Sequence, residues 1–121
     1  MPPLFRVCAA NAGVTALLGV NPTRLFPFGG APENVPKPYA VYQVLNGVPE
    51  NYLAEPPDVD DWSIQVDIYA TTVSDVNAVL AALRRAIEPH AYITRLGGTG
   101  TEPNTQLKTT SFDVSWTHTT Q

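Results

Sequence analysis

The sequence is poor in cysteine, in charge and in long apolar runs. A single Cys8 in 121 residues excludes an internal disulfide framework, and two distant histidines offer no zinc-ligand spacing with it. No apolar run approaches the ~20 residues that a membrane-spanning helix needs. The N-terminal MPPLFRVCAANAG also lacks the basic segment and long apolar stretch of a signal peptide. We therefore expect a soluble protein that begins in a cytoplasm and has no membrane partner.

Charge is scarce as well, and it is not clustered in a basic patch. Charged residues make up 15% of the chain, against roughly 25% in typical soluble domains. The net charge is −4 and the seven basic residues are scattered, whereas binding to a phosphate backbone requires a basic stripe. We therefore do not expect direct nucleic-acid binding. A surface with so few charges often lies against another protein.

The clearest structural signal is the stretch DDWSIQVDIYATTVSDVNAVLAALRRAIEP, residues 60–89. Apolar and polar residues alternate over 62–69, which predicts a strand with one face in a core. Apolar residues then recur at helical spacing up to Pro89, after a capping Thr72 or Ser74. We expect Leu80 and Leu83 of this helix to pack on the strand. The core face of the strand holds Trp62, Ile64, Val66 and Ile68, and the other face holds Ser63, Gln65, Asp67 and Tyr69.

Weaker signals predict the remaining elements. A helix is expected over 4–18, and Gly19 and the Asn21-Pro22 pair end it. The segment TRLFPF at 23–28 is expected as an edge strand, since Pro27 cannot donate to a central ladder. Aromatic and β-branched residues predict further strands at 39–46, 91–96 and 109–118. One stripe of the first helix is expected to face the core: Phe5, Cys8, Ala9, Ala12 and Ala16, with Leu17 and Leu18 at its end.

The order of these elements predicts the fold class. Strands that come in pairs, joined by short or loose loops, indicate an antiparallel sheet. The two expected helices must then cover one of its faces. The sequence therefore predicts an α+β fold, a mostly antiparallel sheet with two helices packed on one face as a two-layer sandwich. The length fits a single domain over residues 1–121.

Two polar segments separate the strands. Residues 47–61, GVPENYLAEPPDVDD, hold three prolines and five of the eleven carboxylates, and 97–108 is a polar loop. Calcium binding by the acidic segment is disfavoured, because its spacing does not match an EF-hand loop and the central glycine is missing. We expect both segments to be mobile in the isolated protein and to contact partners. The candidate contact residues of the first are Glu50, Glu55, Asp58, Asp60 and Asp61.

No arrangement of residues indicates catalysis. The GGTG at 97–100 is followed by Glu102 and Pro103 rather than by a helix, so it is not a phosphate loop. Asp113 and Ser115 share one face of the last strand, while His118 falls on the other, which rules out a nucleophile triad. Cys8 is interpreted as a small buried apolar residue. We therefore expect no enzyme activity, no cofactor and no metal.

Several passages, taken in order, resemble one known family. They are PPLFRVCAANAGVTALLG, TRLFPFGGAPENVPKPYAVYQ, the strand WSIQVDIYATT running into NAVLAALRRAIEP, and finally SFDVSW. Together they cover nearly the whole chain and resemble the tail completion, or tail terminator, family of tailed bacteriophages. The resemblance implies a structural protein of the virion tail or neck, assembled in the host cytoplasm. It also implies a six-membered ring that stops growth of the tail tube and joins the head connector, with the tail tube protein and the connector protein as partners.

In such a ring, the free face of the sheet is expected to line a channel or to pack on a neighbouring subunit. Gln65, Asp67 and Tyr69 are the candidate residues for this interface or lumen. A polar wall without phosphate-neutralising charge would let DNA pass as cargo without specific binding. The alternative is a small α+β ligand-binding or regulatory domain, in which the same face forms a pocket. The mass of the protein in solution distinguishes the two.

Overall fold

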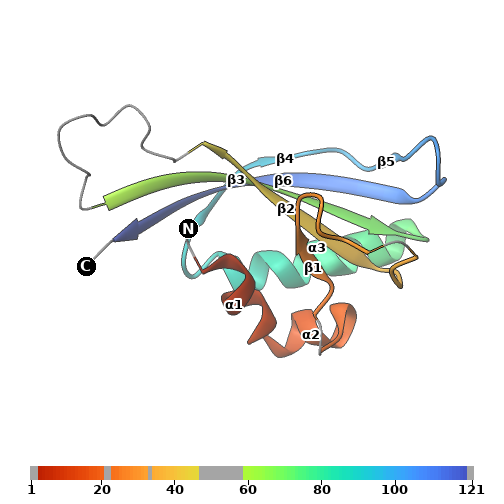
Figure 1. Cartoon of the computed structure of the whole chain (residues 1–121), viewed down its shortest axis with the longest axis horizontal. Coiled ribbons are helices and arrows are strands. Elements are labelled where there is room, and N and C mark those ends of the chain that lie inside the picture. Colours follow the sequence, from red (N-terminus) through yellow and green to blue (C-terminus); the bar gives the residue numbers. More distant parts are fainter. Residues whose placement is uncertain (1–2, 21–22, 33, 47–58, 120–121) are drawn as a thin grey trace.

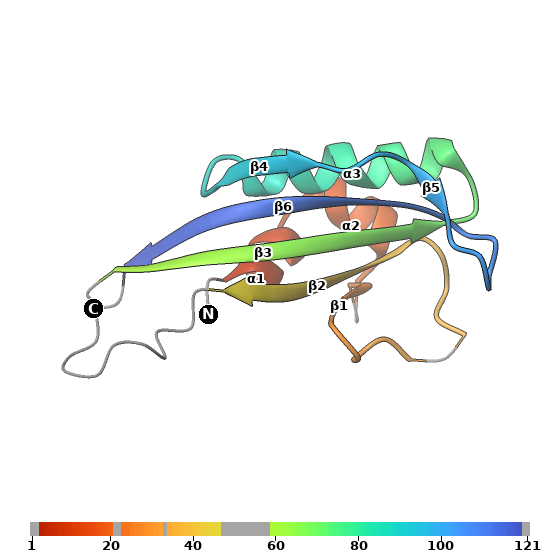
Figure 2. The ribbon, with the colours of Figure 1, turned by 90° about the horizontal axis from the view of Figure 1, so that it is seen from above.

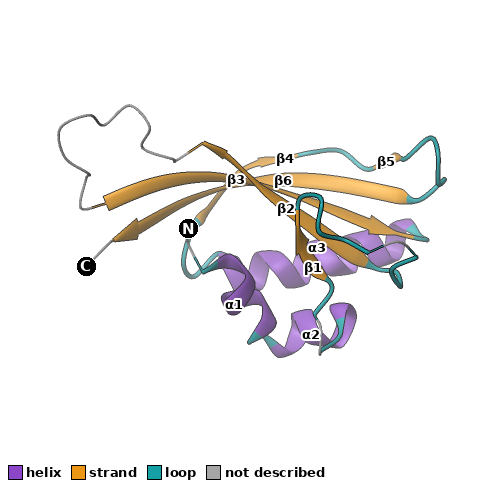
Figure 3. Ribbon diagram, viewed as in Figure 1, coloured by secondary structure: helices purple, strands orange, loops and turns teal. Residues whose placement is uncertain are grey.

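A mostly antiparallel sheet lies over a layer of helices in the computed structural model, which describes residues 3–20, 23–32, 34–46 and 59–119 (Figure 1, Figure 3). In chain order the elements of these ranges are α1 (Leu4–Ala9), α2 (Ala12–Leu18), β1 (Leu25–Pro27), β2 (Tyr39–Asn46), β3 (Val59–Ala70), α3 (Val73–Ile87), β4 (Tyr92–Leu96), β5 (Gly100–Thr101) and β6 (Lys108–Thr119). The strand order across the sheet is β1-β2-β3-β6-β4, and β5 pairs with β6. The predicted α+β class is confirmed.

The antiparallel pair β3–β6 forms the centre of the sheet. Its register runs without a break from Val59–Thr119 to Ala70–Lys108. The predicted alternation is confirmed on both strands, with Ile64, Val66 and Ile68 of β3 and Phe112, Val114 and Trp116 of β6 buried in the core. The ends of this pair that hold Val59 and Thr119 extend past the helices (Figure 2).

The start of β3 corrects one prediction. Asp60 and Asp61 were expected in the acidic loop, yet they lie in β3 and pair with His118 and Thr117. The long partner strand explains the difference, because a continuous ladder outweighs the low strand preference of aspartate. The remaining candidate residues of that loop, Glu50, Glu55 and Asp58, lie outside the described residues.

Helix α3 supplies the apolar surface that covers the sheet. Thr72, one of the two predicted cap residues, is its N-cap, and the Thr72 hydroxyl accepts a hydrogen bond from the Asp75 N–H at 3.1 Å. The predicted packing is confirmed, since Leu83 is 1% exposed in the core and Leu80 is half-buried against it. Arg84 and Arg85 lie in the last turn, where positive charge is favourable to the helix dipole.

The first helical segment differs from the prediction. Instead of one helix over 4–18 there are two, α1 and α2, because the Asn11 side chain accepts the Val14 N–H at 3.1 Å and starts a new helix. The break changes which residues face the core. Buried side chains are Leu4 and Cys8 in α1 and Val14 and Leu18 in α2. Of the predicted stripe, Phe5, Ala12 and Ala16 are exposed instead, and Cys8 keeps its predicted place.

The two margins of the sheet are short strands. The predicted edge strand is confirmed as β1, which contains Pro27 and pairs with β2 in parallel. On the other side β4 pairs with β6 only. The segment 97–108, predicted as a loop, contains β5, which adds Gly100 and Thr101 to the β6 ladder. That short pairing carried no sequence signal, because the segment has no apolar alternation.

Candidate interaction surface on the open sheet face

All three described helices lie on one side of the sheet, and none of them covers the other face (Figure 1). Gln65, Asp67 and Tyr69 alternate with the buried residues of β3 and are half-buried on this face. Their position on the side away from the helices is as the sequence predicted. We call this surface the open face and define it by the residues of β2, β3, β6 and β4 that point away from the helices.

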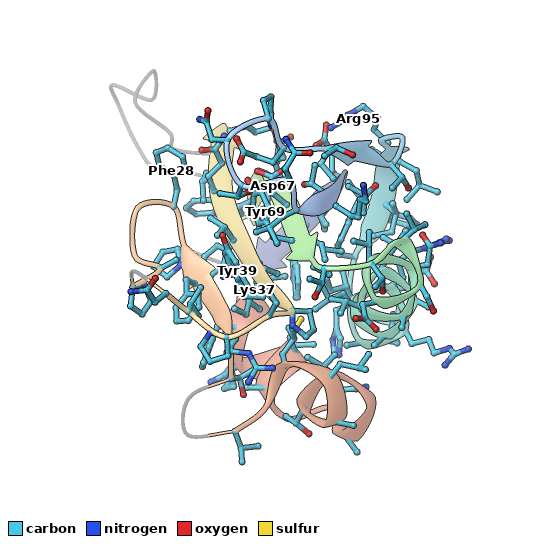
Figure 4. The ribbon with its side chains drawn as sticks, turned by 90° about the vertical axis from the view of Figure 1, so that its right-hand side faces the viewer. Phe28, Lys37, Tyr39, Asp67, Tyr69 and Arg95 are labelled. Carbon is cyan, nitrogen blue, oxygen red and sulfur yellow. The ribbon has the colours of Figure 1, made fainter. Side chains whose placement is uncertain are left out.

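Aromatic rings line one end of the open face. Tyr39 of β2 lies opposite Tyr69 of β3, and the two rings stack with centroids 5.1 Å apart and planes at 21°. Phe26 of β1 continues the row, with its centroid 6.5 Å from Tyr39. Figure 4 shows Tyr39 and Tyr69 side by side, with Asp67 above them. Such cross-strand aromatic pairs stabilise a sheet and hold both rings in place.

Burial raises the pKa of both tyrosines, and nearby negative charge adds to the effect. For Tyr39 the second cause is Glu102, and for Tyr69 it is Asp67. Both rings therefore stay neutral hydrogen-bonding groups at physiological pH. The Glu102 carboxylate is fixed by Thr105, whose hydroxyl and N–H donate to it at 2.6 and 2.9 Å, and these bonds lower its pKa.

The middle of the open face is a row of polar side chains bonded to one another. The Gln65 side-chain amide donates to the Asp67 carboxylate at 3.0 Å. Arg95 of β4 forms a two-point ion pair with Asp113 of β6, with Nε–Oδ2 at 2.9 Å and an Nη2–Oδ1 hydrogen bond at 3.1 Å. The same guanidinium donates to the Ser111 hydroxyl at 3.3 Å. The hydrogen bond to Asp113 and the negative charge of that carboxylate raise the pKa of Arg95.

The charge balance of this row is slightly negative. Asp67 and Asp113 carry two negative charges and Arg95 carries one positive charge that Asp113 neutralises. The open face therefore offers no excess positive charge among its described side chains. A surface of this kind does not attract a phosphate backbone.

The structure also places the residues that the sequence analysis considered for catalysis or metal binding. Asp113 binds Arg95, and His118 lies in β6 with a side chain outside the described set. Cys8 is fully buried, and burial raises the pKa of its thiol to about 12, which makes it unreactive. Within the described ranges, no group of three or more His, Cys, Asp or Glu residues is placed to hold a metal ion. Among the same residues, no helix combines the length and apolar character needed to cross a membrane.

Arg95 is a residue of this surface that the sequence did not predict. Its side chain reaches the open face because β4 carries a register shift between Ile93 and Arg95. A basic residue in an edge strand was the only available signal, and it does not predict a partner. Away from this face, the exposed His90 ring stacks on the buried Trp116, with centroids 6.0 Å apart.

The comparisons with known proteins show the family of the chain. The family model described as tail completion protein gp17 matches residues 2–119. No curated protein matches the chain. The family match covers nearly the whole sequence, as the resemblance had implied, and its members are structural proteins of phage tails. The chain belongs to the tail completion protein gp17 family and is a structural component of a bacteriophage tail.

Proposed function

We propose that the chain forms a six-membered ring that closes the end of the tail tube and presents a surface to the head connector. The observation that carries the proposal is the open face, a side of the sheet that none of the described helices covers (Figure 1). Its polar side chains bond one another, Gln65 to Asp67 and Arg95 to Asp113. A sheet that meets a neighbour or lines a narrow channel gains from such an ordered row, because the row fixes the pattern of charge and hydrogen-bonding groups that the face presents.

In the ring, Gln65, Asp67 and Tyr69 face the lumen or the adjacent subunit. The net negative balance of the face suits a lumen, because DNA then passes as cargo without being held by its phosphates. The partners in this proposal are further copies of the chain, the tail tube protein and the connector protein. The site of action is the tail or neck of the virion, assembled in the host cytoplasm. The five acidic candidates Glu50, Glu55, Asp58, Asp60 and Asp61 are proposed as partner contacts.

The test is the number of copies at the tube end. Purified tail tubes are incubated with the protein, and the bound complex is measured by native mass spectrometry and electron microscopy. The proposal predicts six copies at one end and tubes that no longer elongate when tube protein is added. Tubes that keep growing, or a bound stoichiometry other than six, would overturn it.

The alternative, a small ligand-binding or regulatory domain, uses the open face as a pocket. Its polar side chains are already bonded within the chain, Gln65 to Asp67 and Arg95 to Asp113, which leaves few groups free for a ligand. This favours the ring. A protein that stays monomeric both alone and with tail tubes would reverse the preference.

A further inference from the structure

The end of the open face that holds the tyrosine pair carries negative charge without a matching cation. Burial and the nearby Glu102 charge raise the pKa of Tyr39, and burial together with the charges of Asp67 and Glu102 raises the pKa of Tyr69. Neither carboxylate forms an ion pair with a described residue, and Lys37, two residues before Tyr39, pairs with neither of them. We call Tyr39, Tyr69, Asp67 and Glu102 the tyrosine site.

The strand register brings Glu102 to the tyrosine pair. Tyr39 of β2 lies opposite Tyr69 of β3, and Tyr69 lies opposite Thr109 of β6. Strand β5 continues this row, since Gly100 lies opposite Thr109, and Glu102 directly follows β5. The row is therefore built by the ladder of four strands, and the tyrosine site has a fixed place at one end of the open face.

Stacked aromatic rings with carboxylates beside them suit an arginine side chain. The guanidinium group is planar and packs on aromatic faces, its aliphatic stem covers apolar surface, and its N–H groups donate to carboxylates. Phe26 and Val41, half-buried on the same face, extend the apolar surface beside Tyr39. The tyrosine site therefore fits an arginine that is presented together with an apolar neighbour.

Three of the five arginines are engaged within their own chain: Arg24, Arg84 and Arg95. The first donates to two backbone carbonyls, and the other two form ion pairs at 2.9 Å. Arg6 in α1 and Arg85 in α3 are exposed on the helix layer, and neither forms an ion pair or a side-chain hydrogen bond with a described residue. These two arginines are the ones that can offer their charge to a neighbour.

Arg6 combines its charge with an exposed aromatic side chain. It directly follows Phe5 in α1, and Phe5 is 41% exposed. Arg85 has an acidic residue, Glu88, nearly one turn ahead of it, and the exposed large apolar residues of the described chain do not adjoin it in sequence. Arg6 is therefore the better match to a site of rings and carboxylates, and Arg85 is a natural control.

Arg6 does not reach the tyrosine site of its own chain. The helices lie on the other side of the sheet from the open face, so the sheet separates the two (Figure 1). A second copy can bring its helix layer to the open face from outside. Because the two surfaces differ, such a contact is head-to-tail, the kind that closes into a ring.

We propose that Arg6 of one copy binds the tyrosine site of the next copy. The contact rests on the proposed function, since it joins neighbouring copies of the ring. The guanidinium group lies on the rings of Tyr39 and Tyr69 and donates to Asp67 and Glu102. This end of the open face is then a subunit contact.

Charge reversal tests the contact. The measured quantity is the protein concentration at which half of the purified tail-tube ends carry a ring, counted in electron micrographs. Arg6→Glu and Glu102→Arg should each raise this concentration at least about tenfold, because like charges then face one another across the contact. Both changes in one chain restore opposite charges between neighbouring copies and should recover most of the assembly. A double variant no better than the weaker single variant would overturn the contact.

Arg85→Glu is the matched control, because it makes the same charge change at the other exposed arginine of the helix layer. It should assemble like the parent, and circular dichroism checks that every variant is folded. If Arg85→Glu loses as much assembly as Arg6→Glu, the effect comes from net charge and the contact is wrong. Rings that form equally well with the parent and both single variants would overturn the contact alone. A parent protein that forms no ring on tubes would overturn the proposed function, and with it the contact.

Discussion

Arg95 reaches the open face because one extra residue, Thr94, is inserted in the ladder between β4 and β6. Ile93 lies opposite Val114 and Arg95 opposite Asp113, so Thr94 has no partner of its own in the register. This bulge turns the guanidinium toward Asp113. The arginine side of the ion pair is about half exposed, and exposed pairs contribute little to stability. Its effect is therefore to fix the charge pattern of the face more than to stabilise the fold.

Leu83 is one of the fully buried residues of α3, and its loss should weaken the core. It is 1% exposed, so Leu83→Ala should lower the free energy of unfolding by ~2–5 kcal/mol through the cavity it leaves. Leu80→Ala is the matched control and should cost less, because Leu80 is only half-buried. Chemical denaturation followed by circular dichroism measures both. Equal small losses would contradict the packing of α3 on β3.

Cys8 gives a prediction about pH. Burial raises the pKa of its thiol from 9.0 to about 12, so the folded protein keeps the proton that the unfolded chain loses above about pH 9. The Cys8 contribution to stability should be complete below pH 9 and should fall between pH 9 and pH 12. Iodoacetamide at about pH 9 should label the urea-unfolded chain quickly and the native protein hardly at all. Rapid labelling of the native protein would show that Cys8 is not buried in it.

At the scale of the element, alternation was sufficient to predict β3, β6 and the packing of α3. The sequence did not reveal the break between α1 and α2. The Asn11 side chain accepts a backbone N–H and so caps α2. The apolar spacing alone was equally compatible with Asn11 inside one continuous helix. Because the break shifts the helical phase, the predicted stripe was wrong at Phe5, Ala12 and Ala16.

The N-terminus of α3 offers a test with a neighbouring control. The Thr72 side chain accepts the Asp75 N–H, whereas the exposed Thr71 has no such cap role. Thr72→Ala should lower stability by ~0.5–2 kcal/mol, and Thr71→Ala should change it by less than ~0.5 kcal/mol. Thermal unfolding of both variants checks the difference. If the two variants melt together, Thr72 is not the cap.

At the scale of the whole molecule, the sequence predicted which residues of β3 face away from the helices but not what lies beside them. The stacking of Tyr69 on Tyr39 and the Arg95–Asp113 pair depend on the register between strands. The alternation of apolar and polar residues predicts which side chains share a face of the sheet. It does not predict the register between β2 and β3, because a long segment joins the two strands. The structural role came from the order of motifs along the chain, and the family match confirms it.

The substitution Asp67→Lys tests the role of the open face most directly. Asp67 is half-buried on the open face of β3 and accepts one hydrogen bond, from Gln65, so the variant should fold and lose at most ~1.5 kcal/mol of stability. In a ring of six, it places a girdle of positive charge in the lumen, which holds DNA phosphates, or it reverses a contact between subunits. Asp75→Lys is the control. It makes the same charge change on the exposed first turn of α3 and costs only ~0.3–1 kcal/mol through the helix dipole.

The measurement is complementation of a phage that lacks this protein, scored in micrographs by tail length and by the number of tails joined to heads. We expect the Asp67→Lys variant to stay folded, with only the small loss of stability of one hydrogen bond, and to yield tails of uncontrolled length or tails without heads. The Asp75→Lys control should yield normal particles. Normal particles at normal yield with Asp67→Lys would contradict the account, because the open face would then be ordinary solvent-exposed surface.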